Sequence, residues 1–383
     1  MNRVLFFILV GFVLLLMDWY VYQAIRTVIR NLSVDTQRVI TLIYWGFTAL
    51  SVSVFLFMQL SPPDLLGRHT RTFLYAGIFI PYLSKVFAIV FILIDDIGRF
   101  FRWVASLFYR PDVREAADDA TRPNMPQTDV ITRSDFLMKT ALVAGAIPLV
   151  GFSWGIISGA HDYRVRRVKL SLKNLPSGFE GMRIAQLSDI HSGSFFNKTA
   201  VKGGVEMLLN EKPDMIFFTG DLVNNTADEV QDYVEIFRHV KAPLGAFSTL
   251  GNHDYGDYVQ WPNEQVKRQN LNNLKEAHRL LGWNLMMDEN RIFTQNGDKI
   301  ALIGIQNWGA GARWPKYGDL TKAYRGTEDY PVKLLLSHDP SHWDAQVRPK
   351  FPDIDVMFAG HTHGMQLGVE IGDFKWSPSQ YAY

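Results

Sequence analysis

Cysteine is absent from the 383 residues of the chain. Its absence excludes disulfide bonds, thiolate metal sites and a cysteine nucleophile. It does not fix the compartment, because an oxidising compartment permits disulfides without requiring them. An excess of one charge is also missing: 39 basic side chains face 38 acidic ones, for a net charge of +1. A nearly neutral chain gives no reason to expect nucleic acid as a partner.

Polar residues are scarce in the first 160 positions, and this scarcity has a pattern. A membrane-spanning helix needs about 20 mostly apolar residues. Four runs satisfy this requirement: 4–25, 39–60, 72–94 and 136–159. One such run could be a buried core helix, but four in series predict an all-α membrane region over residues 1–160. The first run is longer than the apolar part of a typical signal peptide and no small-residue cleavage pattern follows it, so we expect a retained helix.

Two charged residues, Asp18 and Lys85, lie inside these apolar runs. Charges at such positions can mark a transport path. The interpretation we favour is a snorkelling lysine and an aspartate at the membrane interface.

The basic residues of the short loops predict the orientation of the chain. Arginines are frequent after the first run, at 26, 30 and 38, and after the third, at 99, 102, 110, 114, 122 and 133; the other face has only Arg3, Arg68 and Arg71. This bias predicts a multi-pass protein of the inner membrane with its catalytic half outside the cytoplasm. Residues 132–139 also resemble a twin-arginine export signal that lacks one arginine; a coincidental arginine before a helix explains them equally well. Basic residues over 164–169 favour the opposite orientation.

The second half, residues 161–383, has a different texture. Short β-rich runs alternate with helical segments, and we expect strands at 182–187, 215–219, 245–250, 299–305, 332–336 and 355–358. Five of these runs are followed at once by Asp, Asn or His residues: Asp-Ile-His, Gly-Asp, Gly-Asn-His-Asp, a lone His and Gly-His-Thr-His. In an α/β fold the loops at the carboxyl ends of strands converge, so these side chains are expected to meet at one edge.

The converging side chains are carboxylates, imidazoles and one carboxamide, with no sulfur. Such a set suits Mn, Fe or Zn and is large enough for two divalent ions that share one carboxylate. Two neighbouring ions can hold a phosphoryl group and generate a hydroxide nucleophile. Manganese is our first expectation for the metal.

The order of these five motifs resembles that of the calcineurin-like metallophosphoesterase superfamily over about residues 182–364. The resemblance implies an α/β fold, a four-layer α/β/β/α sandwich, with a dinuclear site at one edge of the sheets. It implies that Asp189, His191 and His363 hold one metal, that Asn252, His338 and His361 hold the other, and that Asp221 bridges both. His253 would protonate the leaving oxygen, and Asp254 would orient the His253 imidazole.

Within this superfamily the chain looks most like membrane-anchored bacterial phosphoesterases, which are often assigned to the hydrolysis of UDP-2,3-diacylglucosamine in lipid A synthesis. We therefore expect a hydrolase of phosphodiester, phosphomonoester or pyrophosphate bonds, and membrane attachment favours a lipid-linked substrate. A non-catalytic membrane sensor or transporter with a phosphoester-binding domain is the alternative. A nucleic-acid exonuclease would need a basic groove. No protein partner can be inferred.

Three further expectations concern the surroundings of the site. The chain stops at Tyr383, where the resemblance predicts additional strands, so we expect a truncated C-terminus. The aromatic loops 255–263 and 307–317 could cover a lipid or sugar or simply pack, with Arg313 as a candidate phosphate clamp. The histidines outside the motifs, among them His278, are expected at the surface; so is His342, although it could instead approach the substrate.

Overall fold

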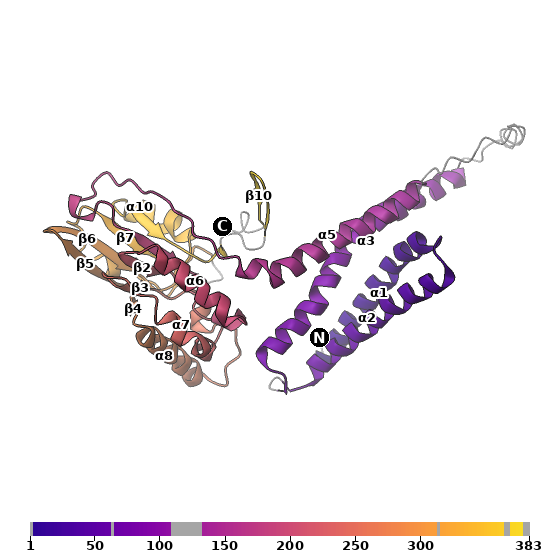
Figure 1. The fold of residues 1–383 in the computed structure, drawn as a ribbon, viewed down its shortest axis with the longest axis horizontal. Coiled ribbons are helices and arrows are strands. Elements are labelled where there is room, and N and C mark those ends of the chain that lie inside the picture. Colours follow the sequence, from indigo (N-terminus) through magenta and orange to yellow (C-terminus); the bar gives the residue numbers. More distant parts are fainter. Residues whose placement is uncertain (1–2, 63–64, 109–131, 312–314, 364–367, 378–383) are drawn as a thin grey trace, which may run out of the picture. The chain divides into compact units, whose positions relative to one another are not determined.

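The structure is a computed structural model, and it describes residues 3–62, 65–108, 132–311, 315–363 and 368–377. The chain divides into two compact units, Met1–Asp162 and Tyr163–Tyr383. Each unit has a hydrophobic core of its own. Figure 1 shows long helices in the first unit and strands with helices in the second.

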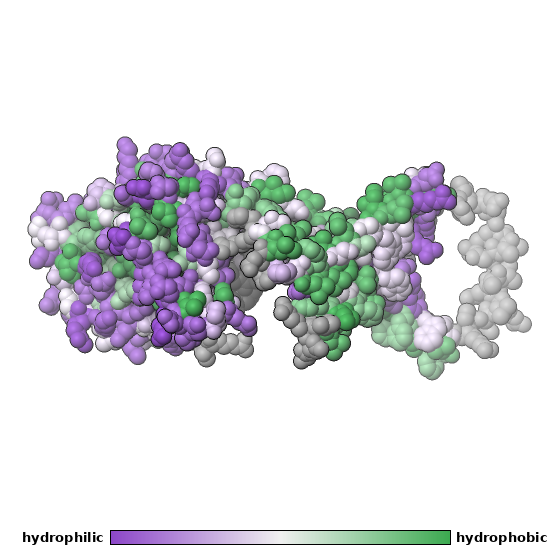
Figure 2. Space-filling model, turned by 90° about the horizontal axis from the view of Figure 1, so that it is seen from below, coloured by the Kyte–Doolittle hydropathy of each residue, from purple (hydrophilic) through white to green (hydrophobic). Residues whose placement is uncertain are grey.

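The first unit consists of long apolar helices: α1 (Arg3–Ile29), α2 (Val34–Leu60), α3 (Arg68–Phe108) and α5 (Arg133–Ile157). All four are long and apolar enough to cross a membrane, and each overlaps one of the four predicted runs. Large apolar side chains such as Leu42 and Val150 lie exposed on their surfaces, and Figure 2 shows hydrophobic residues covering these helices. Exposing such a large apolar surface to water is unfavourable, so we expect these helices to be surrounded by membrane lipid.

Helix α3 is longer than the predicted span. It continues beyond residue 94 to Phe108, so Arg99, which we expected in a loop, lies within the helix. The reason is local charge pairing: Arg99 lies one turn after Asp95 and Asp96 and forms ion pairs with both carboxylates. Pairs at these spacings stabilise a helix by about 0.2–0.5 kcal/mol each, so they favour its continuation past Asp95 and Asp96.

The interpretation of Asp18 and Lys85 as interfacial and snorkelling residues was wrong. The Asp18 side chain is fully buried, and the Lys85 ammonium group on α3 forms an ion pair with it. Tyr82 donates a hydrogen bond of 2.5 Å to Asp18 Oδ2, and Tyr44 on α2 donates one of 3.1 Å to Oδ1. The charges therefore face the interior of the helix bundle, where protein groups replace the missing water.

The second unit contains two four-stranded sheets. The first has the parallel order β1 (Ile184–Leu187), β2 (Met215–Phe218), β3 (Ala246–Ser248), β4 (Asn284–Leu285). The second has the order β5 (Glu289–Gln295), β6 (Asp298–Gly304), β7 (Lys333–Leu336), β8 (Val356–Phe358), in which only the β5–β6 pair is antiparallel. A separate hairpin pairs β9 (Val369–Ile371) with β10 (Phe374–Trp376).

Three hydrophobic layers hold the sheets and helices together, as the alternation of side chains along each strand dictates. On β2, Met215 and Phe217 pack between the two sheets, whereas Ile216 and Phe218 pack beneath the helices α6 (Lys198–Asn210), α7 (Val234–Phe237) and α8 (Glu264–Leu281). On β7, Leu335 faces the other way, toward α9 (Leu320–Tyr324), the π-helical turn Trp343–Val347 and the adjacent α10 (Arg348–Lys350). The result is the expected four-layer α/β/β/α sandwich (Figure 1).

Six strands of this unit were predicted from the sequence, and all six are present: five are shorter than predicted, and β6 is shifted by one residue. The edge strands β4 and β5 were not predicted, because their residues are largely polar. The expectation that His278 and His342 lie at the surface was also wrong, since both are fully buried. His278 bonds to Ser248 Oγ at 3.0 Å, and His342 bonds to Ser337 Oγ at 2.9 Å.

Candidate metal centre

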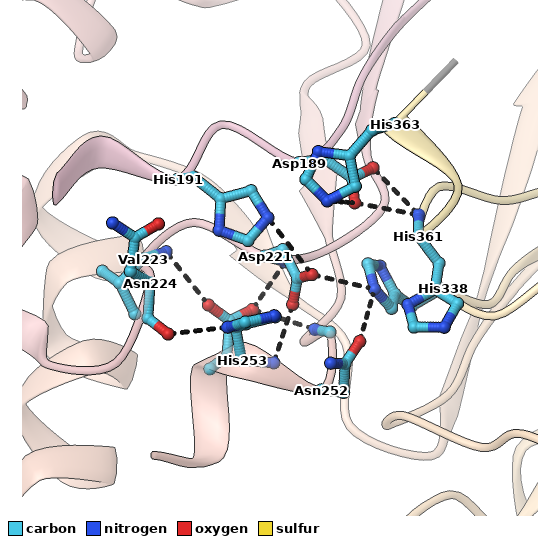
Figure 3. A network of polar contacts seen from close by, with 12 residues as sticks. Asp189, His191, Asp221, Val223, Asn224, Asn252, His253, His338, His361 and His363 are labelled. Carbon is cyan, nitrogen blue, oxygen red and sulfur yellow. Dashed lines mark hydrogen bonds and ion pairs between the residues drawn. The ribbon is translucent and has the colours of Figure 1, made fainter. Parts of the chain in front are cut away.

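The candidate side chains meet at the carboxyl ends of five strands from both sheets. Strand β1 leads to Asp189 and His191, β2 to Asp221, β3 to Asn252, β7 to His338, and β8 to His361 and His363. Figure 3 shows these side chains pointing toward one another, with Asp221 between His191 and His338. Two groups among the described residues could hold a metal ion: Asp189, His191, Asp221 and His363, and Asp221, His338 and His361. Asp221 belongs to both.

The loops that carry these residues have an unusual backbone. Asp189, His191, Asp221, His361 and His363 all have positive φ angles between 46° and 70°. Non-glycine residues rarely adopt this conformation, and where it occurs it clusters at functional sites. Gly251 lies where no other residue would fit, because a Cβ there would come within 2.2 Å of Asp221 Oδ1. The backbone is therefore held in a strained form that brings the side chains together.

Asp221 is the centre of the arrangement and its hydrogen bonding is incomplete. Its Oδ1 accepts a hydrogen bond of 2.9 Å from the backbone N–H of His253. Its Oδ2 lies 3.1 Å from His338 Nε2 and 3.5 Å from His191 Nε2, but neither approach has the direction of a hydrogen bond. A buried carboxylate oxygen rarely lacks a hydrogen bond. Here a cation could bind between this oxygen and the two imidazole nitrogens and so satisfy all three atoms.

The imidazoles are held in a form suited to binding metal. His338 Nδ1 lies 2.8 Å from the carbonyl oxygen of Thr219, and this contact directs Nε2 toward Asp221 and Asn252. In a metal-ligating histidine, the ring N–H that does not face the metal usually donates a hydrogen bond to such an oxygen. The Nε2 of His191 is buried and makes no hydrogen bond. Oxygen and nitrogen donors, one shared carboxylate and two orphaned buried atoms fit a pair of divalent ions.

The electrostatics around Asp221 follow from burial and proximity. Burial by itself would raise the pKa of Asp221, but the neighbouring His338 and His191 rings hold that pKa below its usual range. Burial lowers the pKa of His191, and burial together with the nearby His338 lowers that of His361. Burial by itself would lower the pKa of His338, but the charge of Asp221 outweighs burial and raises that pKa to about 9. A metal ion binds the neutral imidazole and the ionised carboxylate, so it would displace this proton from His338.

His253 lies beside the cluster, at the start of the turn that follows β3. Its ring contacts the His191 ring with centroids 4.8 Å apart, and its Nδ1 lies 2.7 Å from the backbone oxygen of Asn224. If Nδ1 donates to this carbonyl, Nε2 is the nitrogen left for proton transfer.

The hydrogen bonds of Asp254 reach the backbone of two loops. Its carboxylate does not contact the His253 ring; instead it accepts backbone N–H bonds from Gly251, Asp221, Leu222 and Val223. Burial and the charge of Asp221 raise the pKa of Asp254, and these N–H donors oppose the shift. Asp254 therefore shapes the backbone of the two loops, and the described contact of His253 Nδ1 is with the carbonyl oxygen of Asn224, a backbone group that no side-chain motif could reveal.

The two aromatic loops beside the site are tied together. The rings of Tyr255 and Tyr317 stack with centroids 3.8 Å apart, and the Tyr317 hydroxyl donates to Asp257 at 2.8 Å. Tyr258, from the first loop, contacts both Asn252 and the His253 ring. Sequence reasoning did not single out this residue. Arg313, the expected phosphate clamp, lies outside the described residues.

A two-sheet α/β sandwich with an Asp/His cluster at one sheet edge, preceded in the chain by four apolar helices, is the combination expected of a membrane-associated metalloprotein. Residues 182–365 match the family model for calcineurin-like phosphoesterase, and residues 2–160 match the one for the probable calcineurin-like phosphoesterase transmembrane domain. Residues 182–365 therefore belong to the calcineurin-like phosphoesterase family, and residues 2–160 to the transmembrane domain of probable phosphoesterases of this type.

Curated relatives point in the same direction. A transmembrane protein with metallophosphoesterase domain from Danio rerio is 30% identical over 234 residues, which cover 59% of this chain and 50% of that protein. The uncharacterized metallophosphoesterase YkuE of Bacillus subtilis is 27% identical over 245 residues, which cover 62% of this chain and 78% of that protein. The UDP-2,3-diacylglucosamine pyrophosphatase LpxG of Chlamydia trachomatis is 25% identical, with 58% of this chain and 76% of that protein covered. The chain spans about half the length of the first of these relatives.

Proposed function

We propose that the chain is a membrane-anchored hydrolase of a lipid-linked phosphodiester or pyrophosphate and that it uses two divalent ions held around Asp221. The observation that carries the proposal is the buried Asp221 oxygen that two imidazole nitrogens approach without hydrogen-bonding to it. Asp189, His191 and His363 would hold one ion, Asn252, His338 and His361 the other, and Asp221 would bridge them. Divalent ions at these positions would supply an activated water and neutralise phosphate charge.

The protein groups would divide the remaining work. Bound phosphate would lie at the edge where the strands of both sheets end, next to His253. The carbonyl of Asn224 fixes the His253 ring, so Nε2 can deliver a proton to the leaving oxygen. Asp254 holds the backbone that presents Asp221. Neither group would form a covalent intermediate with the substrate.

Substrate, metal and sidedness are the finer parts of the proposal. Membrane attachment and the similarity to LpxG favour UDP-2,3-diacylglucosamine, and with it a role in lipid A synthesis. The oxygen and nitrogen donor set suits manganese first, with iron and zinc as alternatives. The arginine bias of the loops favours a catalytic unit outside the cytoplasm. A nucleotide-linked substrate made in the cytoplasm would argue for the opposite side.

The test is an assay of the detergent-solubilised full chain with Mn²⁺ and UDP-2,3-diacylglucosamine, read as UMP release, with the His253→Ala variant as the control. Release that disappears in the variant supports the enzyme and the lipid substrate together. No release while an aryl phosphodiester is still cleaved keeps the metal chemistry and removes the substrate. Bound metal without cleavage of either compound would contradict the proposal and support a phosphoester sensor.

A further inference from the structure

Tyr258 occupies a position that the function proposed above does not yet use. It belongs to the loop after β3, and 45% of its surface is exposed although it contacts two residues of the site. The Nδ2 of Asn252 donates a hydrogen bond of 2.7 Å to the Tyr258 hydroxyl. The Tyr258 ring also lies against the His253 ring, with centroids 4.6 Å apart at an angle of 40°. One side chain thus contacts a candidate metal ligand and the candidate acid.

The contact with Asn252 bears on how this carboxamide can act as a ligand. Only the amide oxygen has lone pairs for a metal, because the amide nitrogen is a donor. Asn252 Oδ1 lies 3.0 Å from His338 Nε2, so the oxygen end of the amide faces the cluster. The nitrogen end then faces outward and needs an acceptor, and the Tyr258 oxygen is that acceptor.

The Tyr258 backbone is held in place independently of the cluster. Asp257, its neighbour in the chain, accepts a hydrogen bond from Tyr317 and forms an ion pair of 2.6 Å with Lys267 on α8. The indole of Trp261 donates to the carbonyl of Gly256 at 2.7 Å. A loop tied at several points can hold a side chain in one orientation before any ligand arrives.

We infer that Tyr258 is a positioning residue that keeps the Asn252 amide oxygen turned toward the second metal position and buttresses the His253 ring. The inference rests on the proposed function, since it assigns Tyr258 a task only if Asn252 is a ligand. The hydroxyl and the ring have separable tasks: the hydroxyl acts on the metal ligand, and the ring acts on the acid.

The experiment compares Tyr258→Phe with Tyr258→Ala in the full chain and measures Mn²⁺ affinity together with kcat and KM on an aryl phosphodiester. Loss of a group that orients a ligand typically weakens metal binding by about 10- to 100-fold. We expect Tyr258→Phe to weaken one of the two Mn²⁺ sites by about tenfold and to leave the other unchanged. Tyr258→Ala should show the same loss and, in addition, a lower kcat at saturating Mn²⁺, with KM little changed.

Two controls separate this role from a structural one. Tyr317→Phe removes a hydroxyl that ties the same loop but lies away from Asn252, and Tyr324→Phe removes one that donates to Asp353. Both should keep the affinity of the two Mn²⁺ sites. Unchanged Mn²⁺ affinity in Tyr258→Phe, or an equal loss in Tyr317→Phe, overturns the inference. If Tyr258→Phe weakens one of the two Mn²⁺ sites as expected but the wild-type chain cleaves no phosphodiester, the positioning role stands and the proposed function fails.

Discussion

Two buried aspartates, one in each unit, differ in how completely the protein surrounds them. Asp18 in the membrane region has an ion pair with Lys85 and hydrogen bonds from Tyr44 and Tyr82. Asp221 in the catalytic unit has one backbone donor on Oδ1, and its Oδ2 makes no hydrogen bond. Within lipid a charge must be satisfied by the protein itself. At the sheet edge an incomplete carboxylate leaves a place for a cation.

The comparison implies different consequences for the same substitution. Asp221→Asn should lower hydrolysis of an aryl phosphodiester by more than about 100-fold, because the change removes the charge shared by both metal positions, not merely a group that surrounds a ligand. Asp18→Asn, the matched change in the other unit, should leave the turnover of folded protein unchanged. Equal losses of turnover in the two variants would contradict the division of roles.

His253 sharpens the account of the catalytic unit. Replacing it with Gln should reduce kcat by about 10²- to 10⁴-fold, the usual contribution of a general acid, while bound metal stays the same. Asn224→Ala is the matched control: its backbone carbonyl, which contacts His253 Nδ1, remains, so kcat should change little. A large loss of kcat in Asn224→Ala would mean that the side chain, not the carbonyl, positions the ring. Steady-state kinetics with metal analysis decides between these outcomes.

Removing one member of the Asp18–Lys85 pair should lower the stability of the protein and leave its turnover unchanged. Asp18→Ala leaves the Lys85 charge uncompensated inside the bundle, which typically costs about 3–5 kcal/mol. The double variant Asp18→Ala with Lys85→Met removes both charges and should recover most of the loss. Thermal unfolding of the detergent-solubilised chain measures the effect. A double variant no more stable than the single one would show that the pair does not act as a unit.

The smallest expected effect concerns pH and His278. Burial lowers the pKa of this histidine to about 3, whereas a histidine in an unfolded chain has a pKa of about 6.5. The contribution of His278 to the free energy of unfolding is therefore fully present above about pH 6.5. This contribution decreases as the pH falls from there toward the folded pKa.

A matched pair of variants isolates this effect. His278→Gln should reduce the acid-induced fall in the unfolding temperature, and His239→Gln, at an exposed position, should leave the fall unchanged. The measurement is the unfolding temperature from pH 7 to pH 4 for both variants and the wild-type chain. An unaltered acid limb in His278→Gln would rule out this histidine as a source of the pH dependence.

The sequence predicted much of both units because strong local patterns specify them. Four long apolar runs in series predict membrane helices. Parallel strands that are followed by Asp, Asn or His bring those side chains to one edge of the sheet. Features that depend on tertiary contacts were not predictable. Asp18 and Lys85 are 67 residues apart and pair only when α1 and α3 pack. Burial of His278 follows from its position on the inner face of α8. The contact of Asn224 with His253 is made by a backbone oxygen, which leaves no signature in the sequence.

The most direct test of the account is the number of Mn²⁺ ions held by the full chain after loading and removal of free metal. The account predicts two ions per chain in the wild type and in Asp18→Asn, and a clear loss in Asp221→Asn. A wild-type chain that retains no metal, or an Asp221→Asn chain that retains as much as the wild type, would contradict the claim that Asp221 is the centre of a dinuclear site.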